Sequence, residues 1–187
     1  NAVKNRTLWI VVAVMAIILV SGVSMYNGMV IDNEKIDNAW SQVESQLQRR
    51  SDLIPNLVAT TKAYATQEKE IFTQVAEARS KLAGANTLGE KAQADADLGS
   101  ALSRLLVVVE RYPELKSDAN FRQLSDQLEG TENRLATTRR DYNDAVRSYN
   151  TRIKRFPGNI IAGMAGFESR EYFQAAEGAQ KVPEVKF

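Results

Sequence analysis

The sequence predicts an all-α fold, in which an N-terminal transmembrane helix runs into an elongated antiparallel three- or four-helix bundle with a short apolar C-terminal segment and an extended tail. The first observation is an uncharged apolar run from Thr7 to Met25, close to the ~20 residues that span a bilayer. The second is a seven-residue hydrophobic repeat through most of the remaining chain, and the third is a set of stop signals that leave only short connections between helices. We therefore divide the chain into a transmembrane segment (1–28) and a helical domain (29–187), whose last part (157–187) is expected to mediate assembly.

The transmembrane segment is the first element. Its apolar character is carried by Leu8, Trp9, Ile10, Val14, Ile17 and Leu19. A secretory signal is the alternative, because Lys4 and Arg6 precede the run and the small residues at 22–24 resemble a cleavage site. We favour a span because the run is longer than the ~7–15 apolar residues of a signal core. Lys4 and Arg6 precede it, whereas Lys35 is the only basic residue soon after it, which predicts a cytoplasmic N-terminus.

The second element is a long amphipathic helix from Asp32 to Ala83. One seam of its heptad pattern holds Trp40, Leu47, Ile54, Val75 and Leu82, and the other holds Ile36, Val43, Leu57, Tyr64, Ile71 and Ala78. Pro55 removes one helical hydrogen bond, so we expect a kink between Ser51 and Pro55. A break into two helices is the alternative, because Ser51 and Asp52 could cap a second helix.

Two further helices follow. Gly84 to Asn86 predicts a stop, and Thr87 and Glu90 have the spacing of a capping box that starts the next helix, which Pro113 ends. Ser117 and Asp118 then open a helix that Pro157–Gly158 terminates. Its heptad positions hold Phe121, Leu128, Leu135, Tyr142, Tyr149 and Phe156.

The composition argues against an enzyme. The chain has no cysteine and no histidine, so it lacks the commonest nucleophilic thiol, general base and transition-metal ligand. Glu68, Glu70, Glu110 and Glu114 do not make a di-iron site, because that site requires Glu-x-x-His motifs. Lys plus Arg (24) nearly balance Asp plus Glu (23), which argues against a nucleic-acid partner. We predict no catalytic residue, no metal and no cofactor.

Two groups of charged residues have alternative interpretations. Arg49, Arg50, Asp52 and Asn56 surround Pro55 and could form a partner patch, but we favour the interpretation that they satisfy the backbone that the proline disrupts. A basic stripe runs along the last long helix and could meet anionic lipid, although the solvated face of a bundle helix is the simpler interpretation. This stripe contains Arg134, Arg139, Arg140, Arg147, Arg152, Lys154 and Arg155.

The C-terminal segment supplies the candidate assembly contacts. Residues 157–167 are uncharged but too short to span a bilayer. As a helix they place Gly158, Ala162 and Gly166 on one narrow face, which allows close helix approach. The apolar residues of the other faces are Ile160, Ile161, Met164 and Phe167. We expect an oligomer or membrane contact here, the alternative being a cap on the bundle's own core.

The final residues alternate in the manner of a β-strand, with Val185 and Phe187 on one side. A lone strand cannot satisfy its own backbone. We expect it to pair with another subunit, to lie along a groove, or to be disordered.

Two separated motifs resemble the LemA family of bacterial membrane proteins. The first runs from Arg49 to Val58 and continues in Lys62 to Ala65 and Glu68. The second consists of Tyr142-Asn143, Ala145 to Arg147, Tyr149-Asn150, Phe156-Pro157, Asn159 to Ala162, Gly166-Phe167 and Tyr172-Phe173. The resemblance implies a membrane span followed by a helical bundle, and it assigns no catalytic residues.

Together these observations predict a single-pass protein of the bacterial inner (cytoplasmic) membrane, with its soluble domain on the periplasmic or extracellular side. We expect a non-enzymatic helical scaffold that is embedded in the lipid bilayer and forms a homo-oligomer. The alternative is a membrane-tethered binding or sensor module for another membrane protein or a ligand.

Overall fold

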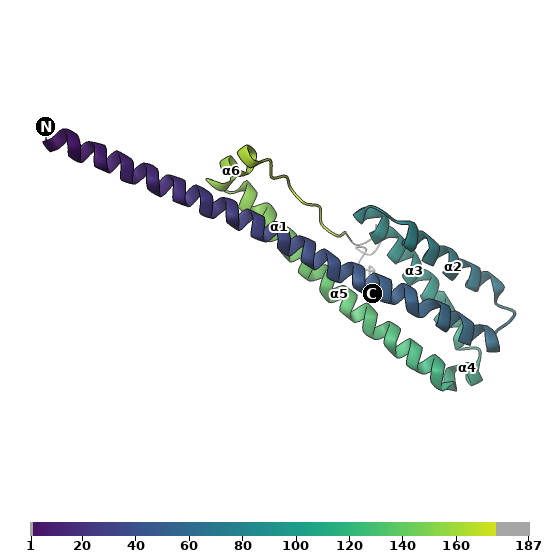
Figure 1. The fold of residues 1–187 in the computed structure, drawn as a ribbon. Coiled ribbons are helices and arrows are strands. Elements are labelled where there is room, and N and C mark those ends of the chain that lie inside the picture. Colours follow the sequence, from purple (N-terminus) through teal and green to yellow (C-terminus); the bar gives the residue numbers. More distant parts are fainter. Residues whose placement is uncertain (1, 175–187) are drawn as a thin grey trace, which may run out of the picture. The chain divides into compact units, whose positions relative to one another are not determined.

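The structure is a computed structural model that describes residues 2–174, with side chains from residue 5 onward. Within this range the chain forms α-helices and no strand, which confirms the predicted all-α class (Figure 1). The helices are α1 (Ala2–Tyr64), α2 (Lys69–Gly84), α3 (Leu88–Val109), α4 (Pro113–Ser117), α5 (Ala119–Lys154) and α6 (Gly158–Ala165). The expected strand at Val185 and Phe187 lies outside the described residues.

The described chain divides into two compact units. The first unit contains residues 2–39 and 142–171, and the second contains residues 40–141 and 172–174. The first unit therefore holds the start of α1, the end of α5 and all of α6. The second holds the remainder of α1 and α5 together with α2, α3 and α4.

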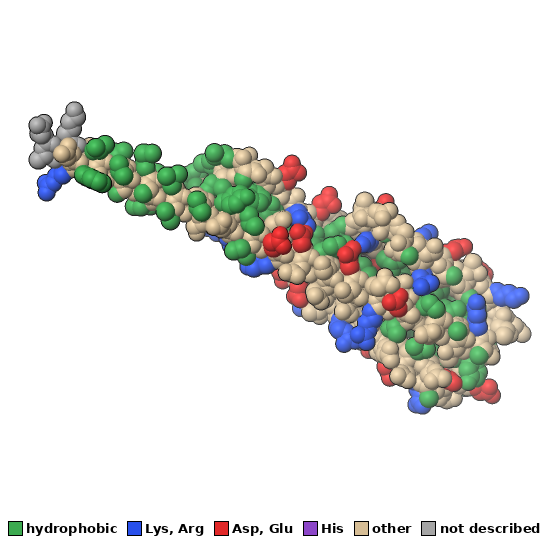
Figure 2. Space-filling model, viewed as in Figure 1, with side chains coloured by type: hydrophobic (Ala, Val, Ile, Leu, Met, Phe, Trp, Pro, Cys, Tyr) green, Lys and Arg blue, Asp and Glu red, His purple; other side chains and the backbone are tan. Residues whose placement is uncertain are grey.

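The side chains at the start of α1 are apolar and exposed. It belongs to the one helix in the described chain that is long and apolar enough to cross a membrane, with a mean hydropathy of 2.6 over its most apolar window. The six residues expected to carry the span are all exposed, and Trp9 is 72% exposed. Hydrophobic side chains cover this part of the surface in Figure 2. The predicted N-terminal apolar helix is therefore confirmed.

The first unit has its own small core beyond this segment. Met29 and Ile36 of α1 pack with Val146 and Tyr149 of α5, and all four are buried. After α6 the chain returns along the unit, where the Asn150 side chain exchanges two hydrogen bonds of 2.9 Å with the backbone of Arg170. These bonds satisfy a buried amide and hold the returning segment in place.

The second unit packs its helices around a leucine-rich core. Its fully buried aliphatic side chains include Leu57, Val75, Leu98, Leu105, Leu115 and Leu135. The helices α2 and α3 form a hairpin. The predicted capping box starts α3, because the Thr87 hydroxyl accepts from the Glu90 N–H while the Glu90 carboxylate accepts from the Thr87 N–H. Asp118 caps α5 in the same way, accepting from the Phe121 N–H at 2.9 Å.

The break in the second predicted element is not where the proline suggests. The alternative of a helix break at Ser51–Pro55 is wrong, since α1 continues through an exposed Pro55 to Tyr64. The chain instead breaks at residues 65–68, between α1 and α2. There the Glu68 carboxylate accepts hydrogen bonds from the Arg111 guanidinium (3.0 Å) and the Tyr112 hydroxyl (3.1 Å). Tertiary contacts to the residues between α3 and α4 therefore stabilise this turn, which contains no glycine or proline.

Candidate functional site

Helix α6 is the centre of the candidate functional surface. It follows Pro157 and ends at Gly166, whose φ of 75° lies in the left-handed region that glycine adopts without strain. The N–H groups of Gly166 and Phe167 both return to the carbonyl of Ala162, the second at 3.0 Å. This local chemistry limits α6 to two turns and positions it beside the start of α1.

The small-residue face of α6 packs against the same chain. Gly158 and Ala162 are buried. A Cβ at Gly158 would lie 2.6 Å from the carbonyl oxygen of Arg152 and 3.2 Å from Cε of Met29, so only glycine fits there. Ile161 reaches across to within 4.0 Å of the Cβ position at Gly22. This face therefore has the chain's own α1 and α5 as its partners.

Phe167 is the aromatic member of the same packing. Its ring centroid lies 5.5 Å from that of Tyr26 and 6.4 Å from that of Tyr149, the second in an edge-on arrangement. Such pairs contribute roughly 0.5–1.5 kcal/mol beyond burial. Phe167 therefore anchors the end of α6 between α1 and α5.

The outer face of α6 is apolar and uncovered. Met164 is 86% exposed and Ile160 is 53% exposed, while a Cβ at Gly163 would meet nothing within 4 Å. Phe156, immediately before Pro157, is also exposed. Hydrophobic side chains gather over α6 as well as over the start of α1 in Figure 2. The expected contact residues thus divide between an inner face, which the chain covers itself, and an outer face that is available to lipid or to a second subunit.

The candidate partner patch around Pro55 is also divided. Arg50 points inward, whereas Arg49, Asp52 and Asn56 are exposed. Asp52 accepts a hydrogen bond from Gln48 one turn earlier, at 2.8 Å. A partner could therefore reach only three of the four predicted residues.

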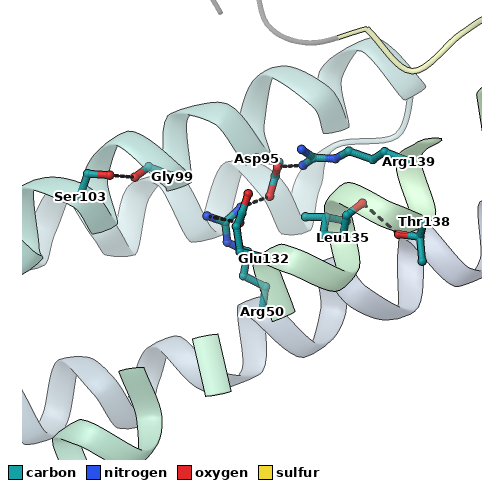
Figure 3. A network of polar contacts seen from close by, with 8 residues as sticks. All are labelled: Arg50, Asp95, Gly99, Ser103, Glu132, Leu135, Thr138 and Arg139. Atoms are coloured by element: carbon teal, nitrogen blue, oxygen red, sulfur yellow. Dashed lines mark hydrogen bonds and ion pairs between the residues drawn. The ribbon is translucent and has the colours of Figure 1, made fainter. Parts of the chain in front are cut away.

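Arg50 belongs to a buried cluster of charges in the second unit, drawn in Figure 3. Its guanidinium binds Asp95 of α3 at 2.6 Å and Glu132 of α5 at 3.0 Å. Arg139 of α5 pairs with the other oxygen of Asp95. The side chains of Arg50 and Asp95 are 7% and 3% exposed, so each charge depends on the others for compensation. Arginine does not release its proton in proteins, and the cluster is therefore suited to structure rather than to proton transfer.

The heptad pattern of the sequence contains a signal that predicts this cluster of charges. Arg50 is one of the four predicted patch residues around Pro55, whereas Asp95 is not among the predicted site residues. Asp95 shares its heptad position with Leu102 and Val109. Opposite charges at seam positions of two neighbouring helices predict a buried pair. Gly99, one turn after Asp95, lies beside the pair, and a Cβ there would be 3.4 Å from Nη2 of Arg50.

The perturbed titratable groups lie at helix ends and in cores. The hydrogen bond to Asp118 raises the pKa of Tyr64, and the Phe121 N–H lowers the pKa of Asp118. The N–H groups of Asn86 and Thr87 lower the pKa of Glu90. Desolvation is the leading cause that raises the pKa of Tyr112, Tyr142 and Tyr149. Every shift moves its group further from neutrality, so none of them creates a general acid or base that works near pH 7. Among the described residues, no group of three or more carboxylates could hold a metal ion.

Comparison with known proteins places this architecture in context. A family model described as "LemA family" matches residues 39–187. The chain is 34% identical over 175 residues to magnetosome protein MamQ 1 of Paramagnetospirillum magneticum, covering 80% of this chain and 64% of that protein. It is 29% identical to magnetosome protein MamQ of Magnetospirillum gryphiswaldense, covering 79% and 64%, and 26% identical to protein LemA of Metamycoplasma hominis, covering 81% and 69%. The chain thus spans less than two thirds of the length of these magnetosome relatives.

Proposed function

Because this chain belongs to the LemA family, we propose that it is a membrane-anchored, non-enzymatic helical scaffold that self-associates in the bacterial envelope. The outer face of α6 is the observation that supports this most directly. Its large apolar side chains, Ile160 and Met164, are exposed next to a helix that is itself apolar enough to enter a bilayer. Contiguous apolar surface of this kind marks a contact with lipid or with another protein.

The position of α6 favours contact at the membrane. Ile161 lies at the level of Gly22, which is three residues inside the predicted apolar span that ends at Met25. At ~1.5 Å per residue, this places part of α6 roughly 5 Å below the end of the span. A second subunit in the same membrane would approach at this level.

Gly163 supplies the close approach that such a contact needs. Between helices in lipid, van der Waals packing replaces the hydrophobic effect, and small residues allow two backbones to come together. Glycine inside a helix is roughly 0.5–1 kcal/mol less stable than alanine, and no neighbour in the described chain requires it at 163. The proposed subunit contact therefore centres on Gly163 and the adjacent side chains of Ile160 and Met164.

The localisation follows from the charges that flank the span. Lys4 and Arg6 precede it, and Lys35 is the only basic residue soon after it. The positive-inside rule then places the N-terminus in the cytoplasm and the helical units on the outer side of the inner membrane.

The deciding experiment is the native mass of the full-length protein in lipid nanodiscs. We expect a discrete particle that is a multiple of the 20.8 kDa chain. Gly163→Leu should shift the particle towards the single chain, since leucine keeps the helix but blocks close approach. Gly89→Leu is the matched control, because Gly89 is also helical and exposed, with open space at its Cβ position, but lies in the second unit.

A second readout uses the cysteine-free sequence. Met164→Cys introduces the only thiol, so oxidation should produce cross-linked chains if the α6 faces meet about a two-fold axis. A wild-type protein of single-chain mass, together with a Met164→Cys variant that fails to cross-link, would contradict the scaffold. That result would favour the alternative of a tethered binding module, with Arg49, Asp52 and Asn56 as its exposed patch.

A further inference from the structure

An open groove of about 840 Å³ lies in the first unit, where α1, α5 and α6 meet. We call it the arginine groove. Its principal lining residues are Met25 and Met29 of α1, Arg147, Arg152 and Arg155 at the end of α5 and the following loop, and Phe156. One groove therefore combines apolar side chains with three guanidinium groups.

The apolar side of the groove includes an aromatic ring in an unexpected place. Phe156 is the last member of the heptad series on α5, in which Tyr142 and Tyr149 are buried. Phe156 itself is 79% exposed. Its ring and the thioether side chain of Met25 offer a surface suited to an acyl chain rather than to water.

The polar side of the groove has more positive than negative charge. Arg147 and Arg155 are eight residues apart, so they lie on one side of the helical path two turns from each other. Arg147 pairs with Asp144 at 3.1 Å, and Nε of Arg152 binds Asp32 at 2.8 Å. The side chain of Arg155 has no hydrogen bond or ion pair among the described residues, although its backbone bonds to Thr151 and Asn159.

Gly28 leaves space for the guanidinium of Arg152. A Cβ at Gly28 would overlap Nη1 of Arg152, so the guanidinium lies directly over the glycine. The pairing with Asp32, whose side chain is 5% exposed, further restrains it. The guanidinium of Arg152 is thus restrained by Asp32, while that of Arg155 is free to meet a ligand.

The groove lies at the depth of a lipid head group. The hydrocarbon core of a bilayer is about 30 Å thick, and head groups extend it to about 40–45 Å, which leaves roughly 5–8 Å of interface on each side. On a helix this corresponds to about three to five residues. Met25 ends the predicted apolar span and Met29 is four residues further, so the groove spans the layer in which phosphates lie.

We propose that the arginine groove binds an anionic phospholipid, with the phosphate at Arg155 and Arg147 and an acyl chain along Met25 and Phe156. This inference rests on the proposed membrane anchoring and goes beyond it by naming a ligand class. Arginine suits the phosphate because its planar guanidinium donates two parallel hydrogen bonds. A net anionic lipid is preferred over a zwitterionic one because the three guanidiniums of the groove pair with only two carboxylates, those of Asp32 and Asp144.

The test is native mass spectrometry of the full-length protein released from nanodiscs that contain equal amounts of phosphatidylglycerol and phosphatidylcholine. We expect selective retention of phosphatidylglycerol. Arg155→Gln should lower its retention about fivefold, the equivalent of ~1 kcal/mol for one basic contact at a membrane surface. Lys154→Gln is the control, since it removes the same charge from an adjacent exposed residue that does not line the groove.

Three outcomes would overturn the inference. The first is equal retention of the two lipids, and the second is an equal loss of phosphatidylglycerol in Arg155→Gln and Lys154→Gln. The third is displacement of the lipid by excess inorganic phosphate, which would indicate a site for a free anion. The same spectra report the number of chains in each particle. A failure of lipid selectivity is therefore distinguishable from a failure of self-association.

Discussion

Replacing Asp95 with asparagine tests whether the buried charge cluster stabilises the second unit. The change preserves the shape of the side chain and creates no cavity, so its effect is electrostatic. It leaves the Arg50 guanidinium, which is 7% exposed, with Glu132 as its remaining charged partner. Removing one member of a buried ion pair costs about 3–5 kcal/mol, because the other charge stays buried without compensation.

We expect a loss near the lower end of that range, about 3 kcal/mol, for two structural reasons. Glu132 still neutralises part of the charge of Arg50. Arg139 is 25% exposed and its guanidinium lies 4.9 Å from the ring of Phe173, so it can turn towards water or stay on the ring. A loss of this size should lower the midpoint of thermal unfolding by roughly 10–20 °C.

The assay follows Trp40 fluorescence during heating in a mild detergent. The chain has two tryptophans, so Trp9→Phe leaves Trp40, in the second unit, as the reporter. Glu132→Gln is the control, because its side chain is 48% exposed and such pairs contribute only about 0–1 kcal/mol. Equal midpoints for Asp95→Asn and Glu132→Gln would refute the reasoning.

Three further predictions concern helix ends, packing and pH. Thr87→Ala removes the cap of α3 and should destabilise the second unit by about 1 kcal/mol in the same thermal assay; no change would show that the Glu90 carboxylate caps the helix alone. Gly158→Ala should dislodge α6, because its Cβ would lie 2.6 Å from a carbonyl oxygen, whereas Gly163→Ala should be neutral or stabilising. Proteolysis between α5 and α6 distinguishes the two variants, and equal resistance of both to the protease would contradict the packing. The pKa values of Glu90 and Asp118 lie below their usual 4.5 and 3.8, so the unfolded chain takes up protons at a higher pH than the folded chain does. The stability that these two carboxylates contribute is complete above about pH 5 and should be lost as the pH falls through and below these values. Urea midpoints measured from pH 7 to pH 3 should fall less steeply for Glu90→Gln, and identical slopes would argue against this linkage.

Local features of the fold could be predicted because their causes lie within a few residues. The capping box at Thr87 and the cap at Asp118 depend on spacing of three residues, and the structure confirms both. The apolar start of α1 depends only on composition, and it is also confirmed.

Features with distant causes could not be predicted in the same way. Pro55 deprives α1 of one hydrogen bond, yet the helix continues because packing on either side of the proline outweighs that loss. The turn at residues 65–68 depends on Glu68 meeting Arg111 and Tyr112, which are more than forty residues away in the chain. Heptad periodicity contains no information on such contacts.

The candidate site shows the same division. The sequence identified 157–167 as an apolar segment with a small-residue face, but periodicity does not say which partner covers each face. The structure places Gly158 and Ala162 against the chain itself and leaves Ile160 and Met164 exposed. The basic stripe with Arg147, Arg152 and Arg155 was predicted as a possible contact with anionic lipid, but the groove was not, because it requires Met25 and Arg155 to meet across 130 positions of sequence.

The buried charges of the second unit also bear on how many arrangements of its helices are acceptable. A leucine seam is nearly unchanged when one helix slides past another by seven residues, because one apolar side chain then replaces the next. If α3 slid by one heptad, Leu102 would take the place of Asp95 opposite Arg50, and a buried guanidinium would face a hydrocarbon side chain. The penalty for that mismatch falls on the shifted arrangement alone. We infer that the main contribution of Arg50 and Asp95 is uniqueness: they make one alignment of α1, α3 and α5 distinct from neighbouring alignments that a purely apolar core would tolerate.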